Sequence, residues 1–121
     1  MPQKHLDPGK FLPLTPAVFH ILLALADGER HGYAIMQEIQ RDTSGRVRMG
    51  PGTLYGTIKR LITIGFIVET DTKSEKPLTD ERRRYYRLTE LGQQVVVAEA
   101  ARLAAAVDLA HAKRLLGDIT S

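Results

Sequence analysis

The sequence predicts an α+β fold that is mostly helical, with one short β-hairpin between helices. Three observations carry this prediction. Apolar residues recur at helical spacing in three segments that precede residue 67. Two short segments, 67–72 and 84–88, alternate apolar and polar residues on either side of a polar, proline-containing turn. A last segment, 89–116, has helical spacing again over roughly 28 residues.

The composition is that of an ordinary globular domain, with 121 residues of which 43% are hydrophobic and 26% charged. Because the chain has no cysteine, it can form neither disulfides nor thiolate metal sites. No apolar run approaches the ~20 residues that a membrane helix needs. The first ten residues lack the apolar stretch of a signal peptide. We therefore expect a cytoplasmic protein that does not enter a membrane.

The chain is expected to begin with an arm and then a helix. Residues 1–13 contain three prolines and show no period, so we expect them to be ordered only if another part holds them. Thr15 is a good N-cap and Pro16 suits the first helical position, whereas Asp27-Gly28 ends the helix. A second helix is expected from His31-Gly32 to about Asp42, with its apolar residues at helical spacing.

The third predicted helix, Pro51 to Phe66 with Gly65 as its cap, has two unlike sides. Leu54, Ile58 and Leu61 recur at helical spacing and predict the core side. The opposite side is small, polar and cationic, and the whole segment lacks an acidic residue. Such a face suits the major groove of B-DNA, which is about 12 Å wide and accepts one helix. The alternative is a core helix with a polar back.

The predicted DNA contacts of this helix are its small, hydroxyl-bearing and cationic residues. We expect base or near-base contacts from Thr53, Thr57 and Arg60, and phosphate contacts from Lys59. Gly56 supplies smallness. Tyr55 has two alternatives, because its hydroxyl could bind a phosphate or its ring could pack against the next strand. The complete set is Thr53, Tyr55, Gly56, Thr57, Lys59 and Arg60.

The hairpin that follows carries a cluster of cations, which predicts contacts to phosphates or to an adjacent minor groove. These cations are Lys73, Lys76, Arg82, Arg83 and Arg84. Residues 46–87 hold ten Lys/Arg and five Asp/Glu, a balance of +5 in a chain of net charge +3, which points to a polyanionic partner. The alternatives are a solvated charged surface, or arginines that pair with Glu69, Asp71 and Glu81 across the sheet.

The last helix is predicted to start after Thr89 and to run to about Leu116. At about 42 Å it is longer than the preceding domain can cover. Its seam alternates spacings of four and three and is interrupted once, by Arg102. We expect this helix, with a second apolar stripe on the first helix, to form a dimer; the alternative is a helix folded back on its own core. The predicted interface residues are Phe19, Leu23, Leu91, Val95, Ala98, Leu103, Ala105, Leu109, Ala112 and Leu116.

No catalytic or metal-binding pattern stands out. The chain has no glycine-rich phosphate loop, no nucleophile elbow and no HExxH. The four histidines form no close spacing with Asp or Glu that would indicate a metal. We therefore expect neither an enzyme, nor a cofactor, nor a metal site.

Three motifs in order resemble the PadR family of bacterial transcriptional regulators, and specifically its short subgroup with a single C-terminal helix. They lie in LTPAVFHILLALADGERHGYAIMQEI, GPGTLYGTIKRLITIGFI and RRRYYRLTELG. The resemblance implies a homodimer of winged helix-turn-helix domains whose C-terminal helices pair across a two-fold axis. It also implies a repressor that is released from DNA when a small molecule binds near the dimer interface.

Two departures from the family pattern affect these implications. Many members have a proline where this chain has Gly56, so DNA could approach more closely here. Multidrug-binding relatives stack drugs on a tryptophan, whereas this chain has no tryptophan and no aromatic residue in its last helix. The candidate effector is therefore a small apolar molecule, and the alternative is a closed seam.

The predicted organisation is an N-terminal arm (1–13), a winged helix DNA-binding domain (14–88), and a C-terminal dimerisation helix with its tail (89–121). The predicted function is sequence-specific transcriptional regulation, by repression at a near-palindromic operator in double-stranded DNA. Two alternatives are a winged-helix module that binds other proteins and a ligand-binding protein without direct DNA regulation.

Overall fold

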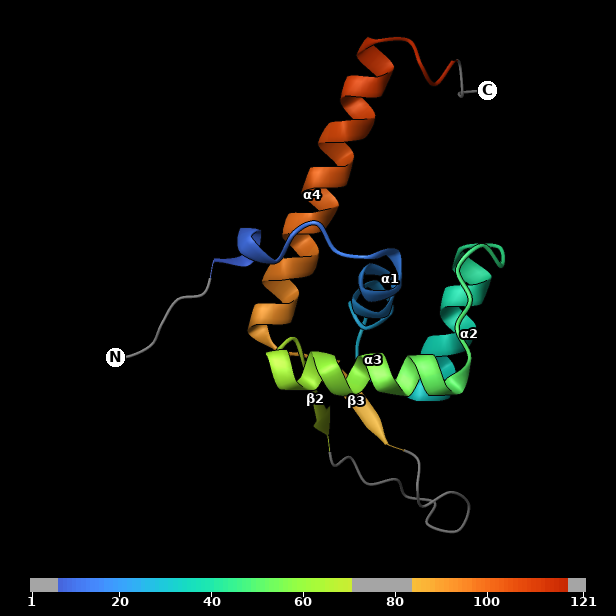
Figure 1. The fold of residues 1–121 in the computed structure, drawn as a ribbon, viewed down its shortest axis with the longest axis vertical. Coiled ribbons are helices and arrows are strands. Elements are labelled where there is room, and N and C mark those ends of the chain that lie inside the picture. The colour runs from blue at the N-terminus through green and yellow to red at the C-terminus, as the bar shows by residue number, and fades with distance from the viewer. Residues whose placement is uncertain (1–6, 71–83, 118–121) are drawn as a thin grey trace.

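A computed structural model describes residues 7–70 and 84–117 of the chain (Figure 1). It confirms the mostly helical α+β fold with a small antiparallel sheet. In chain order the elements are η1 (Pro8–Phe11), α1 (Pro16–Ala24), β1 (Arg30–His31), α2 (Gly32–Asp42), α3 (Pro51–Ile64), β2 (Ile67–Thr70), β3 (Tyr85–Leu88) and α4 (Glu90–Ala112).

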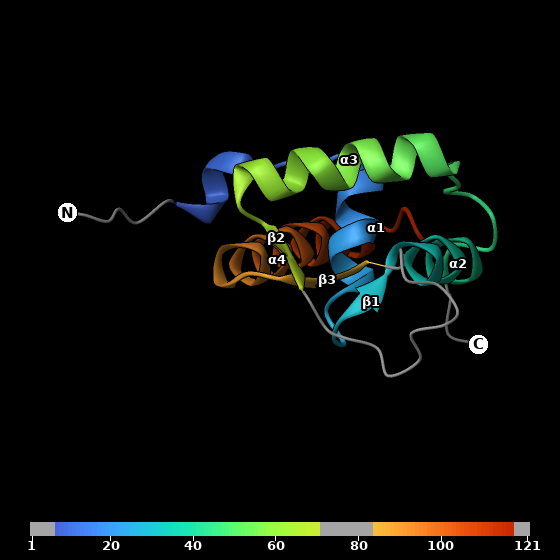
Figure 2. The same cartoon turned by 90° about the horizontal axis from the view of Figure 1, so that it is seen from below.

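The core lies around α1, which has α2 and α4 on either side and α3 across it (Figures 1 and 2). Ile21 and Leu22 of α1, Ile35 of α2, Leu54 of α3 and Val95 of α4 are all fully buried there. The three strands form one antiparallel sheet in the order β1-β3-β2. The winged arrangement thus places α3 and the β2–β3 hairpin next to each other in space.

All four predicted helix starts are confirmed, and three of them carry side-chain caps. The Thr15 hydroxyl accepts from the Val18 amide at 3.1 Å. The Nδ1 atom of His31 accepts from the Ala34 amide at 3.2 Å. The Thr89 hydroxyl accepts from the Gly92 amide and donates to the carbonyl of Gly65. Each cap satisfies an amide that the first turn of a helix leaves without a partner.

The described part of the N-terminal arm is held against the domain. Phe11 meets Phe66 edge to face, with ring centroids 5.0 Å apart. The amide of Leu14 donates to the carboxylate of Glu99 on α4 at 3.1 Å. These two contacts hold the arm in place, as was predicted to be necessary for it to be ordered.

The helix α4 ends earlier than predicted, at Ala112, because Arg114 adopts a left-handed backbone conformation with a φ of 57°. Leu116 was expected on the helical seam and lies beyond the helix instead. The first half of α4 packs on the domain, whereas its second half projects away from the other elements (Figure 1). All side chains from 101 to 109 are exposed.

The prediction that Val95 contacts a second subunit was wrong, because this side chain is fully buried in its own domain. Leu91 also packs partly against that core. The alternative of a helix folded back on its own core therefore holds for the first half of α4. The spacing of the seam could not show which half of the helix packs on its own domain and which half is free for a second subunit. The same apolar periodicity is expected for both kinds of contact.

Candidate nucleic-acid interface

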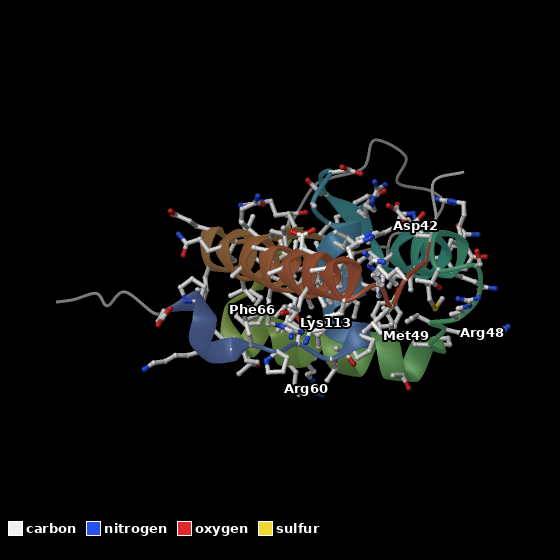
Figure 3. All side chains as sticks on the ribbon, turned by 90° about the horizontal axis from the view of Figure 1, so that it is seen from above. Asp42, Arg48, Met49, Arg60, Phe66 and Lys113 are labelled. Atoms are coloured by element: carbon white, nitrogen blue, oxygen red, sulfur yellow. The ribbon has the colours of Figure 1, made fainter. Side chains whose placement is uncertain are left out.

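The outer face of α3 is small, polar and cationic, as predicted. Thr53, Gly56, Lys59 and Arg60 are all exposed, and no acidic residue lies on this helix. Neither Lys59 nor Arg60 forms an ion pair within the described residues. In Figure 3, Arg60 lies on the outer side of α3. The face can therefore offer two cations and a hydroxyl to an anionic surface.

Thr57 does not lie on this face, which corrects the prediction of a base contact. Its side chain is buried, with 6% of the residue exposed. Its hydroxyl donates to the carbonyl of Thr53 at 2.8 Å, one turn earlier in the helix. Thr57 borders the core residues Leu54, Ile58 and Leu61 around the helix, and a threonine can bury its hydroxyl by bonding the backbone.

Tyr55 lies over the N-terminal turn of α2. Its ring occupies the space that a β-carbon on Gly32 would need. The tyrosine is 44% exposed. It lines a cavity together with Lys59 of α3, Tyr86 of β3 and Arg84, the residue before β3. The ring thus rests on α2 in addition to facing the sheet, and its position is fixed by the absence of a side chain at residue 32.

Of the predicted hairpin cations, Arg84 is the one that lies within the described residues, next to the strand β3. Its guanidinium lies 3.1 Å from the carboxylate of Glu69, so this arginine takes the cross-strand pairing that the sequence analysis held open. The remaining predicted hairpin contacts, Lys73, Lys76, Arg82 and Arg83, lie outside the described residues.

Two exposed arginines immediately before α3 were not among the predicted contacts. Arg46 and Arg48 lie on the connection from α2, and Figure 3 shows Arg48 at its outer end. The Thr43 hydroxyl shapes this connection by accepting from the Val47 amide at 3.0 Å and donating to the Ile39 carbonyl at 2.8 Å. The signal was present in the sequence, because the basic stretch begins at Arg46.

A buried carboxylate joins α4 to the N-terminal arm. Glu99 is only 1% exposed, and it accepts from the Leu14 amide and from the guanidinium of Arg102 at 2.6 and 3.0 Å. The hydrogen bond from Arg102 lowers the pKa of Glu99, and that from Leu14 adds to the effect against the cost of burial. The interruption of the seam at Arg102 is therefore one half of an ion pair.

No group of three or more His, Asp or Glu side chains among the described residues is arranged to hold a metal ion. No helix in these parts of the chain is long and apolar enough to cross a membrane.

The sequence profile of the transcriptional regulator PadR-like family matches residues 21–98. The chain is similar to the transcriptional regulator Rv3488 of Mycobacterium tuberculosis, with 40% identity over 81 residues that make up 66% of this chain and 68% of that protein. It is also 40% identical over 81 residues to an uncharacterized 37.1 kDa protein in transposon TN4556 of Streptomyces fradiae. That match covers 66% of this chain but only 21% of the transposon protein.

Among solved structures, the chain resembles Bacillus subtilis PadR in complex with operator DNA, with a TM-score of 0.60 and 26% identity. The match covers 71% of this chain and 46% of that one. Together with the small antiparallel sheet and the long C-terminal helix, this likeness confirms the predicted winged helix fold.

Proposed function

The chain belongs to the PadR-like family of transcriptional regulators, and on that premise we propose that it is a sequence-specific repressor that binds operator DNA as a homodimer. The observation that carries the proposal is the outer face of α3. This face is small enough for the major groove and presents Lys59 and Arg60 without an acidic residue on the helix. Membership in a family of regulators also agrees with the prediction that the chain is not an enzyme.

The proposed contacts fall into two groups, contacts to bases and contacts to phosphates. Arg60 and Thr53 would face base edges, since arginine and threonine side chains read hydrogen-bonding groups in the major groove. Lys59, Arg48 and the hairpin cations would bind phosphates, which give affinity and salt dependence but little sequence information. The likeness to a regulator solved with operator DNA supports this arrangement.

The proposed dimer uses the second half of α4. Leu103, Val107 and Leu109 are between 37% and 56% exposed, although they are apolar residues on one continuous helix. Leu23 of α1 is a further exposed apolar residue, at 41%. Leu109 shares one side of α4 with Ala105 and Ala112, so a partner helix could approach that side closely and remove it from water, whereas Leu103 and Val107 lie on another side of the helix and would meet a different part of the partner subunit. Two α3 helices about 34 Å apart would then reach successive major grooves of a near-palindrome.

Release by a small apolar effector is also part of the proposal. The exposed half of α4 offers alanine, valine and leucine and no aromatic ring, which suits a small apolar molecule better than a flat drug. Such a molecule would act by binding the DNA-free dimer more tightly than the DNA-bound one, because only differential affinity can shift the equilibrium.

Retention of genomic DNA fragments on the purified protein, followed by sequencing, tests the repressor proposal. We expect enrichment of a near-palindrome upstream of the gene for this chain or its neighbours. If the protein instead captures an acidic partner protein and no duplex, it is a protein-binding module. If a ligand stabilises the protein without changing its DNA affinity, it is a ligand-binding protein whose DNA role is incidental.

A further inference from the structure

A cavity of about 660 Å³ separates α3 from the hairpin. Its walls come from the N-terminal turn of α2, from α3 and from the sheet. Three of the four tyrosines in the chain line it, Tyr33, Tyr55 and Tyr86, together with the cations Lys59 and Arg84. We call these five residues the tyrosine groove. A volume of this size is within the usual range of binding sites in proteins.

The floor of the tyrosine groove holds a polar group that the protein does not satisfy. Tyr86 is 4% exposed, and its hydroxyl takes part in none of the hydrogen bonds between described residues. Burial, with the nearby Glu69 carboxylate, raises the pKa of Tyr86, so the hydroxyl stays protonated and can donate. Buried hydroxyls almost always have a partner, so this one indicates a polar occupant of the groove.

The charge around the tyrosine groove selects an anion as that occupant. Lys59 is exposed and forms no ion pair with a described residue. Glu69 is the acidic residue on the groove, and Arg84 neutralises it at 3.1 Å. Lys59 keeps its positive charge on the lining of the groove, and the partly exposed Tyr33 and Tyr55 add hydroxyl donors to the same lining. This set of donors fits the oxygens of a phosphate.

The position of the tyrosine groove identifies the source of the phosphate. If α3 occupies a major groove and the hairpin reaches the adjacent minor groove, the sugar-phosphate backbone that divides these two grooves must pass between them. The tyrosine groove lies in that interval. We propose that it seats one backbone strand of the operator, with Lys59 and the hydroxyls of Tyr33 and Tyr55 on phosphate oxygens and the Tyr86 hydroxyl donating from the floor. This inference rests on the proposed function.

Gly32 sets the geometry of this seat. A β-carbon at residue 32 would overlap the ring of Tyr55, at the outer end of a side chain that can swing away. Gly32→Ala should therefore displace the Tyr55 hydroxyl from the groove while leaving the core in place. It provides a second way of removing the same contact without removing the tyrosine itself.

The proposed phosphate contacts in the tyrosine groove can be tested by measuring the binding of a labelled operator and of a scrambled duplex. Tyr33→Phe, Tyr55→Phe and Tyr86→Phe each delete one oxygen, and Tyr85→Phe is the matched control because Tyr85 does not line the groove. We expect each groove variant to lose about fivefold in affinity, as for one hydrogen bond, and to lose it equally on both duplexes. Tyr85→Phe should bind as the wild type does. Lys59→Gln should also reduce the slope of log affinity against log salt by about one.

Three outcomes would overturn the proposal. If the groove variants match the wild type on both duplexes, the seat is wrong while the repressor proposal stands. If the wild type binds neither duplex, both proposals fail. The chain has no tryptophan and three of its four tyrosines line the groove, so tyrosine emission reports mainly on the groove. If inorganic phosphate alone saturates that emission and the groove variants keep wild-type DNA affinity, the groove is a site for a free anion.

Discussion

Arg60 is the residue whose role on DNA can be decided by a single substitution. It is exposed on the outer side of α3 and has no ionic partner among the described residues. We predict that Arg60→Ala costs about 1–3 kcal/mol in binding to the operator, because a bidentate contact to a base edge is lost. The loss should be much smaller on a scrambled duplex. An equal loss on both duplexes would show that Arg60 contacts phosphate instead.

The free energy of unfolding should depend on pH through Glu99, and the sign of this dependence follows from the partners of its carboxylate. Arg102 lowers the pKa of Glu99 in the folded state, so the carboxylate stabilises the fold above its unfolded pKa, about 4.3. This contribution is lost as the pH falls through the lower, folded pKa. We predict that Glu99→Gln lowers the free energy of unfolding at pH 7 by about 1–3 kcal/mol.

Urea unfolding from pH 7 to pH 3 measures this contribution. The difference between the wild type and Glu99→Gln should be constant near neutrality and should shrink in acid. Glu90→Gln is a matched control, because Glu90 is exposed on the same helix. A difference that stays the same down to pH 3 would mean that the charge of Glu99 does not stabilise the fold.

A substitution of Gly56 is expected to change protein stability and DNA affinity in opposite directions. Apart from the adjacent residues and the backbone of α3 itself, no atom of the described residues lies within 4 Å of a β-carbon added there, and the residue is in the middle of α3. We predict that Gly56→Ala raises the free energy of unfolding by about 0.5–1 kcal/mol, because glycine lowers helix stability. The same substitution should weaken operator binding, since the methyl group stands between α3 and the DNA. Unchanged or tighter binding would remove Gly56 from the predicted contacts.

At the scale of elements, the sequence predicts the helix starts better than the helix ends. Thr15, His31 and Thr89 cap their helices through bonds to residues three positions later, so the signal is local. The end of α4 depends on a left-handed residue, Arg114, that is not a glycine, and its sequence carries no such signal.

The first strand, β1, could not be predicted for a related reason. It has two residues, too few for an alternating pattern, and it exists because β3 offers backbone partners to Arg30 and His31. The buried position of Thr57 and the pairing of Glu99 with Leu14 likewise depend on contacts between distant segments. The predicted outer face of α3 needed only helical periodicity, and five of its six proposed contacts are exposed at or beside that face, Thr57 being the exception.

The start of α4 packs so closely on the link between α3 and β2 that only glycine fits at residue 92. A β-carbon on Gly92 would overlap the backbone carbonyl of Phe66, which cannot swing away as a side chain can. We predict that Gly92→Ala lowers the free energy of unfolding by about 1–3 kcal/mol, the cost of overpacking. Thermal unfolding of Gly92→Ala should be compared with that of Gly56→Ala, which adds the same methyl group to a helical glycine with open space around it. Wild-type stability in Gly92→Ala would contradict the close docking.

At the scale of the whole molecule, α4 divides into a part that completes the domain and a part that projects from it (Figure 1). The projecting half exposes Leu109 at 56%, in a helix with no described partner on that side. We predict that Leu109→Glu converts a dimer into single subunits at micromolar concentration, because a dimer interface would have to bury the charge. Analytical ultracentrifugation measures this change, with Gln94→Glu on the exposed side of the first half as the control.

Dimerisation should also determine operator binding, because one subunit can reach only one half-site. Leu109→Glu should therefore lose operator affinity while remaining folded, as its helical content shows, and keeping its weaker binding to scrambled DNA. If Leu109→Glu remains a dimer, the projecting half of α4 is not the interface. If it becomes a single subunit and still binds the operator at full strength, the paired arrangement of two α3 helices is wrong.

The binding of purified protein to the enriched near-palindrome, measured against scrambled DNA from low to moderate salt, is the most direct test that α3 reads an operator. The account predicts tight binding to the near-palindrome at a ratio of two subunits to one duplex, with affinity that falls steeply as salt rises. Equal affinity for both duplexes, or an affinity that does not respond to salt, would contradict it.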